Sequence, residues 1–281
     1  MITSEAVTQL THLIAEKNFS MKLPECERVI YEYNPLIEVI AQLKFPTILR
    51  IPNQEPVDFQ DNVRFEYPIF ETSRNLQIPA EISNLLTQFN SNLPSDVTYY
   101  FKSDDLKWQL SFNKDSITFA TTQYERYENF IERFKSVVEV FESIYNPSFY
   151  SRVGLRYRDL IIRSKLNITD KKWQELIPEH IASELHTFEI ADSIQNFIKN
   201  LQIKTELGQV NFNHGLVTVR DTEQSIDETA YLLDSDFFTE DKIQRGDDVW
   251  KILNKSNRTA RNLFRWSITE ELHRAMQPKS I

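Results

Sequence analysis

Glycine is scarce in this sequence: 281 residues contain only four glycines, at widely separated positions. Phosphate-binding loops and dinucleotide-binding fingerprints need clustered glycines, because the backbone must approach the phosphate closely. The four positions are Gly154, Gly208, Gly215 and Gly246. Their spacing argues against a P-loop nucleotide hydrolase and against a standard Rossmann enzyme.

Cysteine is almost absent as well, since Cys26 is the only one. A disulfide within one chain and a cysteine-based zinc site are therefore excluded. The five histidines lack the spacing of the HExxH zinc motif, and the sequence has no Gly-x-Ser-x-Gly elbow. Asp234 and Asp236 offer two carboxylates, but Mg²⁺ needs more converging oxygens, so a polar strand edge is favoured. We expect no metal, no cofactor and no enzymatic activity.

Long apolar runs are missing too. No stretch approaches the roughly 18 apolar residues of a membrane span, and the first residues lack the pattern of a secretory signal. The net charge of −9 argues against nonspecific coating of DNA. What the chain does have is 19 phenylalanines and 11 tyrosines, which are ample for a core. We expect a soluble, cytoplasmic protein without membrane contact.

Two regions of alternating, β-branched and aromatic residues predict strands. The first comprises residues 33–46, with the odd positions buried, and a three-strand meander over residues 97–123. The second comprises residues 149–162 and three strands over residues 193–238. Apolar residues at helical spacing predict long helices over residues 125–145 and 247–276. Shorter helices are predicted at residues 4–17, after Pro56, at residues 80–89 and within residues 170–186.

This order of elements predicts an α+β protein built from two similar halves. Each half would be a mainly antiparallel meander sheet covered by a long amphipathic helix. Residues 1–29 would form an N-terminal extension or short helix, residues 30–165 the first half and residues 166–281 the second. No residue-level repeat supports the duplication, which is a hypothesis.

The segment 151–160, SRVGLRYRDL, places three arginines on one face of a predicted strand, because alternate strand residues share a face. Arg152, Arg156 and Arg158 would stand opposite an apolar face and suit a phosphate or carboxylate. Glu38 has the same parity on the strand 33–46. Two interpretations stay open: acids of neighbouring strands neutralise the arginines, or the arginines bind an external anion or an acidic partner.

A second basic row falls on one side of the predicted last helix. Its members are Lys251, Lys255, Arg258, Arg261 and Arg265. The row suits nucleic acid in principle. A solvated face, or pairing with the acidic segment 221–241, is the ordinary interpretation of such a row.

Two stretches resemble a known family. NPLIEVIAQLKF at residues 34–45 and RVGLRYRDLI at residues 152–161 are similar to the signatures of a sporadically distributed family of uncharacterised bacterial proteins. The closing stretch LFRWSITEEL is also similar to that family's last helix. The resemblance implies no established activity, cofactor or catalytic residue. The family's patchy distribution implies genes of mobile elements or defence islands.

These observations lead to an expectation of binding rather than catalysis. We expect a regulatory protein whose partner is another protein, for example a cognate effector encoded nearby. An antitoxin, an inhibitor or an anti-phage defence accessory would fit. The alternative is nucleic-acid or nucleotide-phosphate binding through the arginine-rich surfaces, and a less favoured one is an enzyme acting on nucleotides. The sequence does not set the oligomeric state.

Overall fold

A computed structural model describes residues 20–73, 97–221 and 226–280 of the chain. The helices predicted at residues 4–17 and 80–89 lie outside these ranges. Within them, no helix is long and apolar enough to cross a bilayer.

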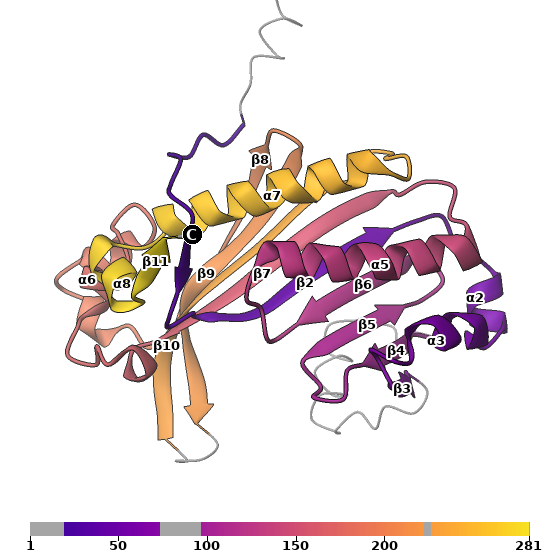
Figure 1. The fold of residues 1–281 in the computed structure, drawn as a ribbon. Coiled ribbons are helices and arrows are strands. Elements are labelled where there is room, and N and C mark those ends of the chain that lie inside the picture. The colour runs from indigo at the N-terminus through magenta and orange to yellow at the C-terminus, as the bar shows by residue number, and fades with distance from the viewer. Residues whose placement is uncertain (1–19, 74–96, 222–225, 281) are drawn as a thin grey trace, which may run out of the picture.

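One nine-stranded antiparallel sheet dominates the fold (Figure 1). In spatial order its strands are β3 (Ile69–Thr72), β4 (Tyr99–Lys102), β5 (Trp108–Phe112), β6 (Ser116–Thr121), β2 (Leu36–Lys44), β7 (Arg152–Ile162), β10 (Ile226–Thr239), β9 (Gly208–Asp221) and β8 (Lys199–Thr205). A separate two-stranded sheet joins β1 (Val29–Tyr31) to β11 (Pro278–Ser280). The predicted meander is confirmed as β4, β5 and β6.

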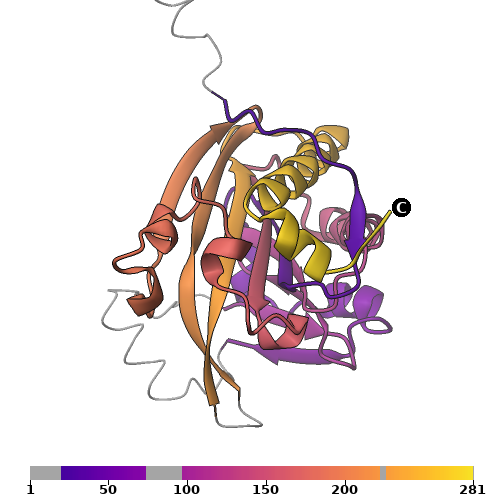
Figure 2. The ribbon, with the colours of Figure 1, turned by 90° about the vertical axis from the view of Figure 1, so that its left-hand side faces the viewer.

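The helices of the described chain differ widely in length. They are α2 (Arg50–Asn53), α3 (Val57–Val63), α5 (Tyr127–Tyr145), α6 (Trp173–Leu176), α7 (Asp247–Trp266) and α8 (Glu270–Ala275), with 3₁₀ turns at Ser164–Leu166, Ser183–His186 and Ala191–Ser193. The two longest, α5 and α7, lie on the same side of the sheet, as two perpendicular views show (Figures 1 and 2).

The prediction of two halves, each with its own sheet, is wrong. Strand β2 pairs with β7, and β7 pairs with β10, so strands on both sides of residue 165 form one continuous sheet. An unpaired edge of β2 or β7 would expose a row of backbone N–H and C=O groups. Pairing between these strands satisfies those groups and leaves no such edge. Whether residues 30–165 and 166–281 are separable stays a prediction.

The predicted last helix is also shorter than expected. It ends at Trp266, and the chain turns before α8 begins. The side chain of Thr269 accepts a hydrogen bond from the backbone N–H of Leu272 and so caps a new helix. An amphipathic pattern continues across this break, and for that reason the sequence predicted one helix.

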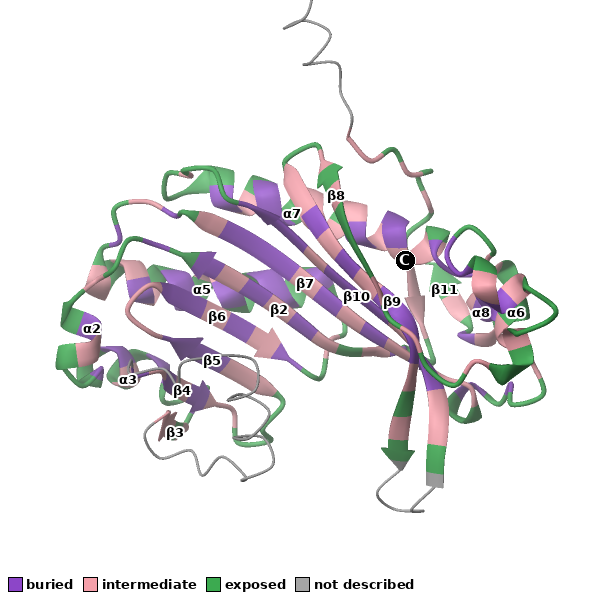
Figure 3. Cartoon of the chain, turned by 180° about the vertical axis from the view of Figure 1, so that it is seen from behind, coloured by how far each residue is buried: buried purple, intermediate pink, exposed green. Residues whose placement is uncertain are grey.

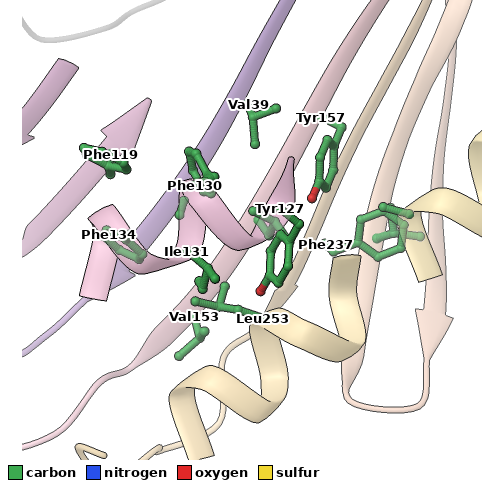
Figure 4. Packing of buried hydrophobic residues seen from close by; sticks show 14 of the residues in the cluster. Val39, Phe119, Tyr127, Phe130, Ile131, Phe134, Val153, Tyr157, Phe237 and Leu253 are labelled. Atoms are coloured by element: carbon green, nitrogen blue, oxygen red, sulfur yellow. The ribbon is translucent and has the colours of Figure 1, made fainter. Parts of the chain in front are cut away.

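The core lies between the sheet and helices α5 and α7. The odd positions Val39, Ala41 and Leu43 of β2 are buried as predicted, whereas Ile37, at the start of the strand, is exposed. Rings from α5 and from β6 gather over this face (Figure 4). Phe134 stacks on Phe119 with ring centroids 5.7 Å apart, and it meets Trp250 of α7 edge-on at 6.0 Å. Phe134 therefore joins both helices to the sheet.

Replacement of this ring tests its place in the core. Phe134→Ala is expected to lower the free energy of unfolding by about 3–5 kcal/mol, because it leaves a cavity among three elements. The matched control, Phe65→Ala, removes a ring that is 88% exposed and should change stability by less than about 0.5 kcal/mol. Urea denaturation measures both, and equal effects would contradict this description of the core.

Candidate functional site

The three arginines of β7 lie on the face of the sheet that neither α5 nor α7 covers. Figure 3 shows the molecule from behind, so that this face points toward the viewer, and none of the described helices lies across it. The register fixes their neighbours: Arg158 is opposite Glu38 of β2 and Asp234 of β10, whereas Arg156 is opposite Asp236. We call this surface the open face.

Arg152 is held by three neighbours at once. Its guanidinium donates to both oxygens of Asp236, at 2.9 and 2.8 Å, and to the amide oxygen of Gln42 at 2.9 Å. It also stacks over the ring of Phe238, 4.5 Å from the centroid. Both bonds to Asp236 come from Nη2 and the bond to Gln42 comes from Nη1, so charge-assisted hydrogen bonds hold the guanidinium in one orientation.

Gly154 makes this arrangement possible. A Cβ atom at this position would stand 2.3 Å from Nη1 of Arg152, so the Arg152 side chain lies directly over the glycine. The sequence suggested that Gly154 opens the strand to a ligand or another chain. The structure instead gives that space to a side chain of the same strand.

The other two arginines are paired as well. Arg156 donates to both oxygens of Asp234, at 2.7 and 2.5 Å, and the Asp234 side chain is almost fully buried. This hydrogen bonding raises the pKa of Arg156. Arg158 donates to Glu38 at 2.8 Å, while its Nε atom is buried and bonds to no described residue. The structure thus brings together all four residues singled out on these strands.

Acids from within the fold therefore neutralise the arginine row. Each arginine bonds to one carboxylate, from β2 or β10, and the Arg156–Asp234 pair is bidentate, with Nε and Nη2 each donating to one oxygen. An external phosphate would have to displace these carboxylates and leave Asp234 buried without a partner, which costs free energy. Asp234 and Asp236 also serve as arginine partners, and no three His, Cys, Asp or Glu residues of the described ranges gather as metal ligands would.

The basic row of α7 is neutralised differently from expectation. Lys251 pairs with Asp248 at 2.8 Å on the same helix, and Lys255 with Glu206 in the β8–β9 turn at 2.7 Å. The remaining arginine pairs reach other segments. Arg258 bonds to Glu25 at 2.5 Å and Arg265 bonds to Glu270.

None of these ion partners comes from the acidic segment 221–241, to which the sequence pointed. The fifth member of the row, Arg261, has no ion pair among the described residues, and its Nε atom is buried without a hydrogen bond. It lines a cavity beneath the helix.

Sequence analysis missed Asp159, which lines the same cavity. It lies on the helix-covered side of β7, and only 8% of its surface is exposed. Burial first, and the charge of Asp234 second, raise its pKa to about 8. The signal was present in the sequence: Asp159 is the one charged residue at the odd, apolar positions of an otherwise well-patterned strand.

Comparisons with known proteins found few similarities to this chain. No family model matches the sequence, and no curated protein matches it. A solved structure with partial likeness is the duplicated taurocyamine kinase from Schistosoma mansoni with bound transition state analog components, at 10% identity and a TM-score of 0.35. The match covers 94% of this chain and 39% of that one. A likeness at this level carries no inference about fold or activity.

The arginine–glycine arrangement leads to a first test at this site. Gly154→Ala should lower the free energy of unfolding by about 1–3 kcal/mol, because the added Cβ displaces the Arg152 guanidinium. In an Arg152→Ala background the same substitution should cost much less. A double-mutant cycle by urea denaturation should give a coupling energy of about 0.5–3 kcal/mol. Additive effects would show that the glycine serves another purpose.

Asp159 leads to a second test, in the pH dependence of stability. Its pKa is about 8 in the folded protein and about 3.9 when unfolded. Between these values the folded state binds more protons, so the Asp159 contribution to stability falls as pH rises from about 4 to about 8. The stability of Asp159→Asn relative to wild type should therefore rise over this window and level off above it. A pH-independent difference would contradict the burial of an ionisable acid.

Proposed function

We propose that this chain is a non-enzymatic binding protein that docks another protein on its open face. The observation that carries the proposal is a wide, polar sheet surface that no described helix covers, although its charges are already paired within the fold. A sheet face that only needed solvation would not require half-buried, hydrogen-bonded ion pairs. Such pairs fit a surface that is held ready for contact, because ordered side chains lose little entropy on binding.

The open face offers a protein many hydrogen-bonding groups. One row of the sheet runs from β5 to β8 through residues that lie directly opposite each other: Gln109, Ala120, Ile40, Arg156, Asp236, Asn211 and Gln202. Amides stand at both ends, Ala120 and Ile40 are apolar, and Arg156 of β7 and Asp236 of β10 each belong to an ion pair. Protein interfaces are similarly mixed, with arginine enriched and about one hydrogen bond per 100–200 Å².

The nucleic-acid alternative finds less support in the same geometry. Phosphate binding relies on lysine and arginine charges that are free to replace counterions. The three arginines of β7 are engaged by Asp236, Asp234 and Glu38, and four of the five basic residues of α7 have acidic partners. A protein partner needs no such displacement. We therefore keep an interaction partner, in the cytoplasm and encoded nearby, as the leading expectation.

Affinity purification from the native host tests this function with matched variants. Ala120→Arg and Asn211→Arg each add a cation to the open face, on either side of the arginine strand. Lys251→Glu, on the exposed side of α7, is the control. We expect wild type and control to recover the partner protein in an equal molar amount. Both face variants should recover at least tenfold less of it.

Two outcomes would overturn the proposal. One is a partner that the face variants retain at wild-type levels while circular dichroism shows them folded. The other is copurified nucleic acid, seen as a raised 260/280 nm ratio that Arg152→Ala abolishes, which would establish the phosphate-binding alternative.

A further inference from the structure

A cavity of about 150 Å³ lies on the other side of the sheet, away from the open face. The strand β7 forms its floor, and helix α7, the start of α5 and strand β1 enclose it. Several contacts hold the segment that contains β1. Strand β1 pairs with β11, and Arg28 bonds to Glu128. The Tyr31 hydroxyl lies 2.8 Å from Nδ1 of His273, within hydrogen-bonding distance. The cavity is therefore enclosed by segments from both ends of the described chain.

The floor of the cavity holds a carboxyl group without a partner. Asp159 makes no hydrogen bond with any residue that the structure describes, although it is more than nine-tenths buried. Buried polar groups in folded proteins are almost always hydrogen-bonded, because an unmade bond costs free energy. Beside it, Ser235 of β10 is also buried and lines the same space. A group that is absent from the chain itself would satisfy this acid.

Two guanidinium groups also line the cavity, that of Arg261, which is partly buried, and that of Arg126, which is exposed. Arg261 of α7 lines the cavity with its Nε buried and without a hydrogen bond in the described structure. Arg126, at the N-terminal end of α5, lines it too and forms no ion pair with a described residue. The N-terminus of this 19-residue helix adds a favourable site for negative charge. Glu125 lines the cavity at this end, and Glu128, which pairs with the lining residue Arg28, also interacts with Arg126.

Aromatic side chains form much of the wall between these charges. Tyr124 and Tyr157 meet edge-on with centroids 6.0 Å apart, and Tyr31 packs edge-on against Phe264 at 5.9 Å. The Tyr157 hydroxyl already donates to Asn257, at 2.8 Å, so its ring and not its proton faces a ligand. Aromatic walls favour an apolar or aromatic body, and they also stabilise a nearby cation.

We propose that this cavity binds a small zwitterion of the α-amino-acid class, with its ammonium group on Asp159 and its carboxylate on Arg261 and Arg126. A simple anion would leave Asp159 without a partner, and a simple cation would face two unpaired guanidinium groups. A zwitterion satisfies both, because its ammonium group stabilises the carboxylate form of Asp159 and so lowers the pKa that burial otherwise raises. The volume fits as well, because a cavity of about 150 Å³ accommodates a ligand the size of benzene, which suits an apolar amino acid. This ligand site is independent of the protein-docking function proposed for the open face.

Calorimetry and thermal denaturation of the full chain with the twenty standard amino acids test the proposal. At least one should bind with a Kd below about 10 mM and raise the melting temperature with concentration, as a ligand of the folded state must. Two analogues of that amino acid serve as comparisons: the amine without the carboxylate group, and the acid without the amino group. Each analogue should bind at least tenfold more weakly than the amino acid. No binding by any amino acid, or equal binding by either analogue, would overturn the proposal.

Variants locate the ligand in this cavity. Asp159→Asn and Arg261→Gln should each weaken the best amino acid at least tenfold, because each removes a charge-assisted hydrogen bond. Arg258→Gln is the matched control: it removes one charge from the same helix, three residues away, outside the cavity lining, and should bind as wild type does. Thermal unfolding without ligand verifies that each variant is folded. Wild-type affinity in both cavity variants, or equal loss in the control, would refute the site.

Discussion

Strand β7 is paired on both edges, and every other feature of the molecule depends on this. Because β2 and β10 take up its hydrogen-bonding groups, the strand has only its two faces to present. One face receives the core and the cavity, and the other carries three arginines. The strict alternation of a β-strand therefore separates two kinds of chemistry that are adjacent in sequence. Tyr157 and Arg158 are neighbours along the chain, yet one contacts α7 and the other contacts β2.

The arginine row shows how the pairing resolves a charge problem in the fold. The arginines of β7 are only partly exposed, so acids of the neighbouring strands satisfy much of their charge. The diagonal pairs do this: Arg156 bonds to Asp234 rather than to the directly opposed Asp236, which is left for Arg152. To reach Asp236, which lies opposite Arg156, the Arg152 side chain passes over Gly154. Gly154 supplies the room.

Local patterns predicted the strands and the buried faces well, because alternation and helical spacing are properties of short segments. They failed where the decisive contact was remote. Asp234 lies 78 residues from Arg156, and no local rule relates the two. The same limit explains the wrong prediction of two sheets, since pairing of β2 with β7 is a choice made across more than a hundred residues. The break before Thr269 was missed because apolar spacing continues through it.

The position of Asp159 is unusual in the sequence, yet the sequence patterns did not single it out as a site residue. A carboxyl at an apolar position of a strand is the kind of local inconsistency that marks strain or function. Its partners could not be read from the sequence, because the cavity around it is assembled from β1, α5, β7, β10 and α7. The resemblance to an uncharacterised bacterial family stays a prediction and assigns no role to this residue.

The two faces of β7 are also linked electrostatically. Asp159 and Asp234 lie on adjacent strands with their side chains on opposite sides of the sheet, and the charge of Asp234 helps to raise the pKa of Asp159. Arg156 offsets that charge from the open face. Any contact that drew Arg156 away from Asp234 would strengthen the repulsion felt by Asp159, and a cation on Asp159 would relieve it. Because partly buried charges are weakly screened by salt, the charge of Asp234 acts on Asp159 from the opposite face of the sheet.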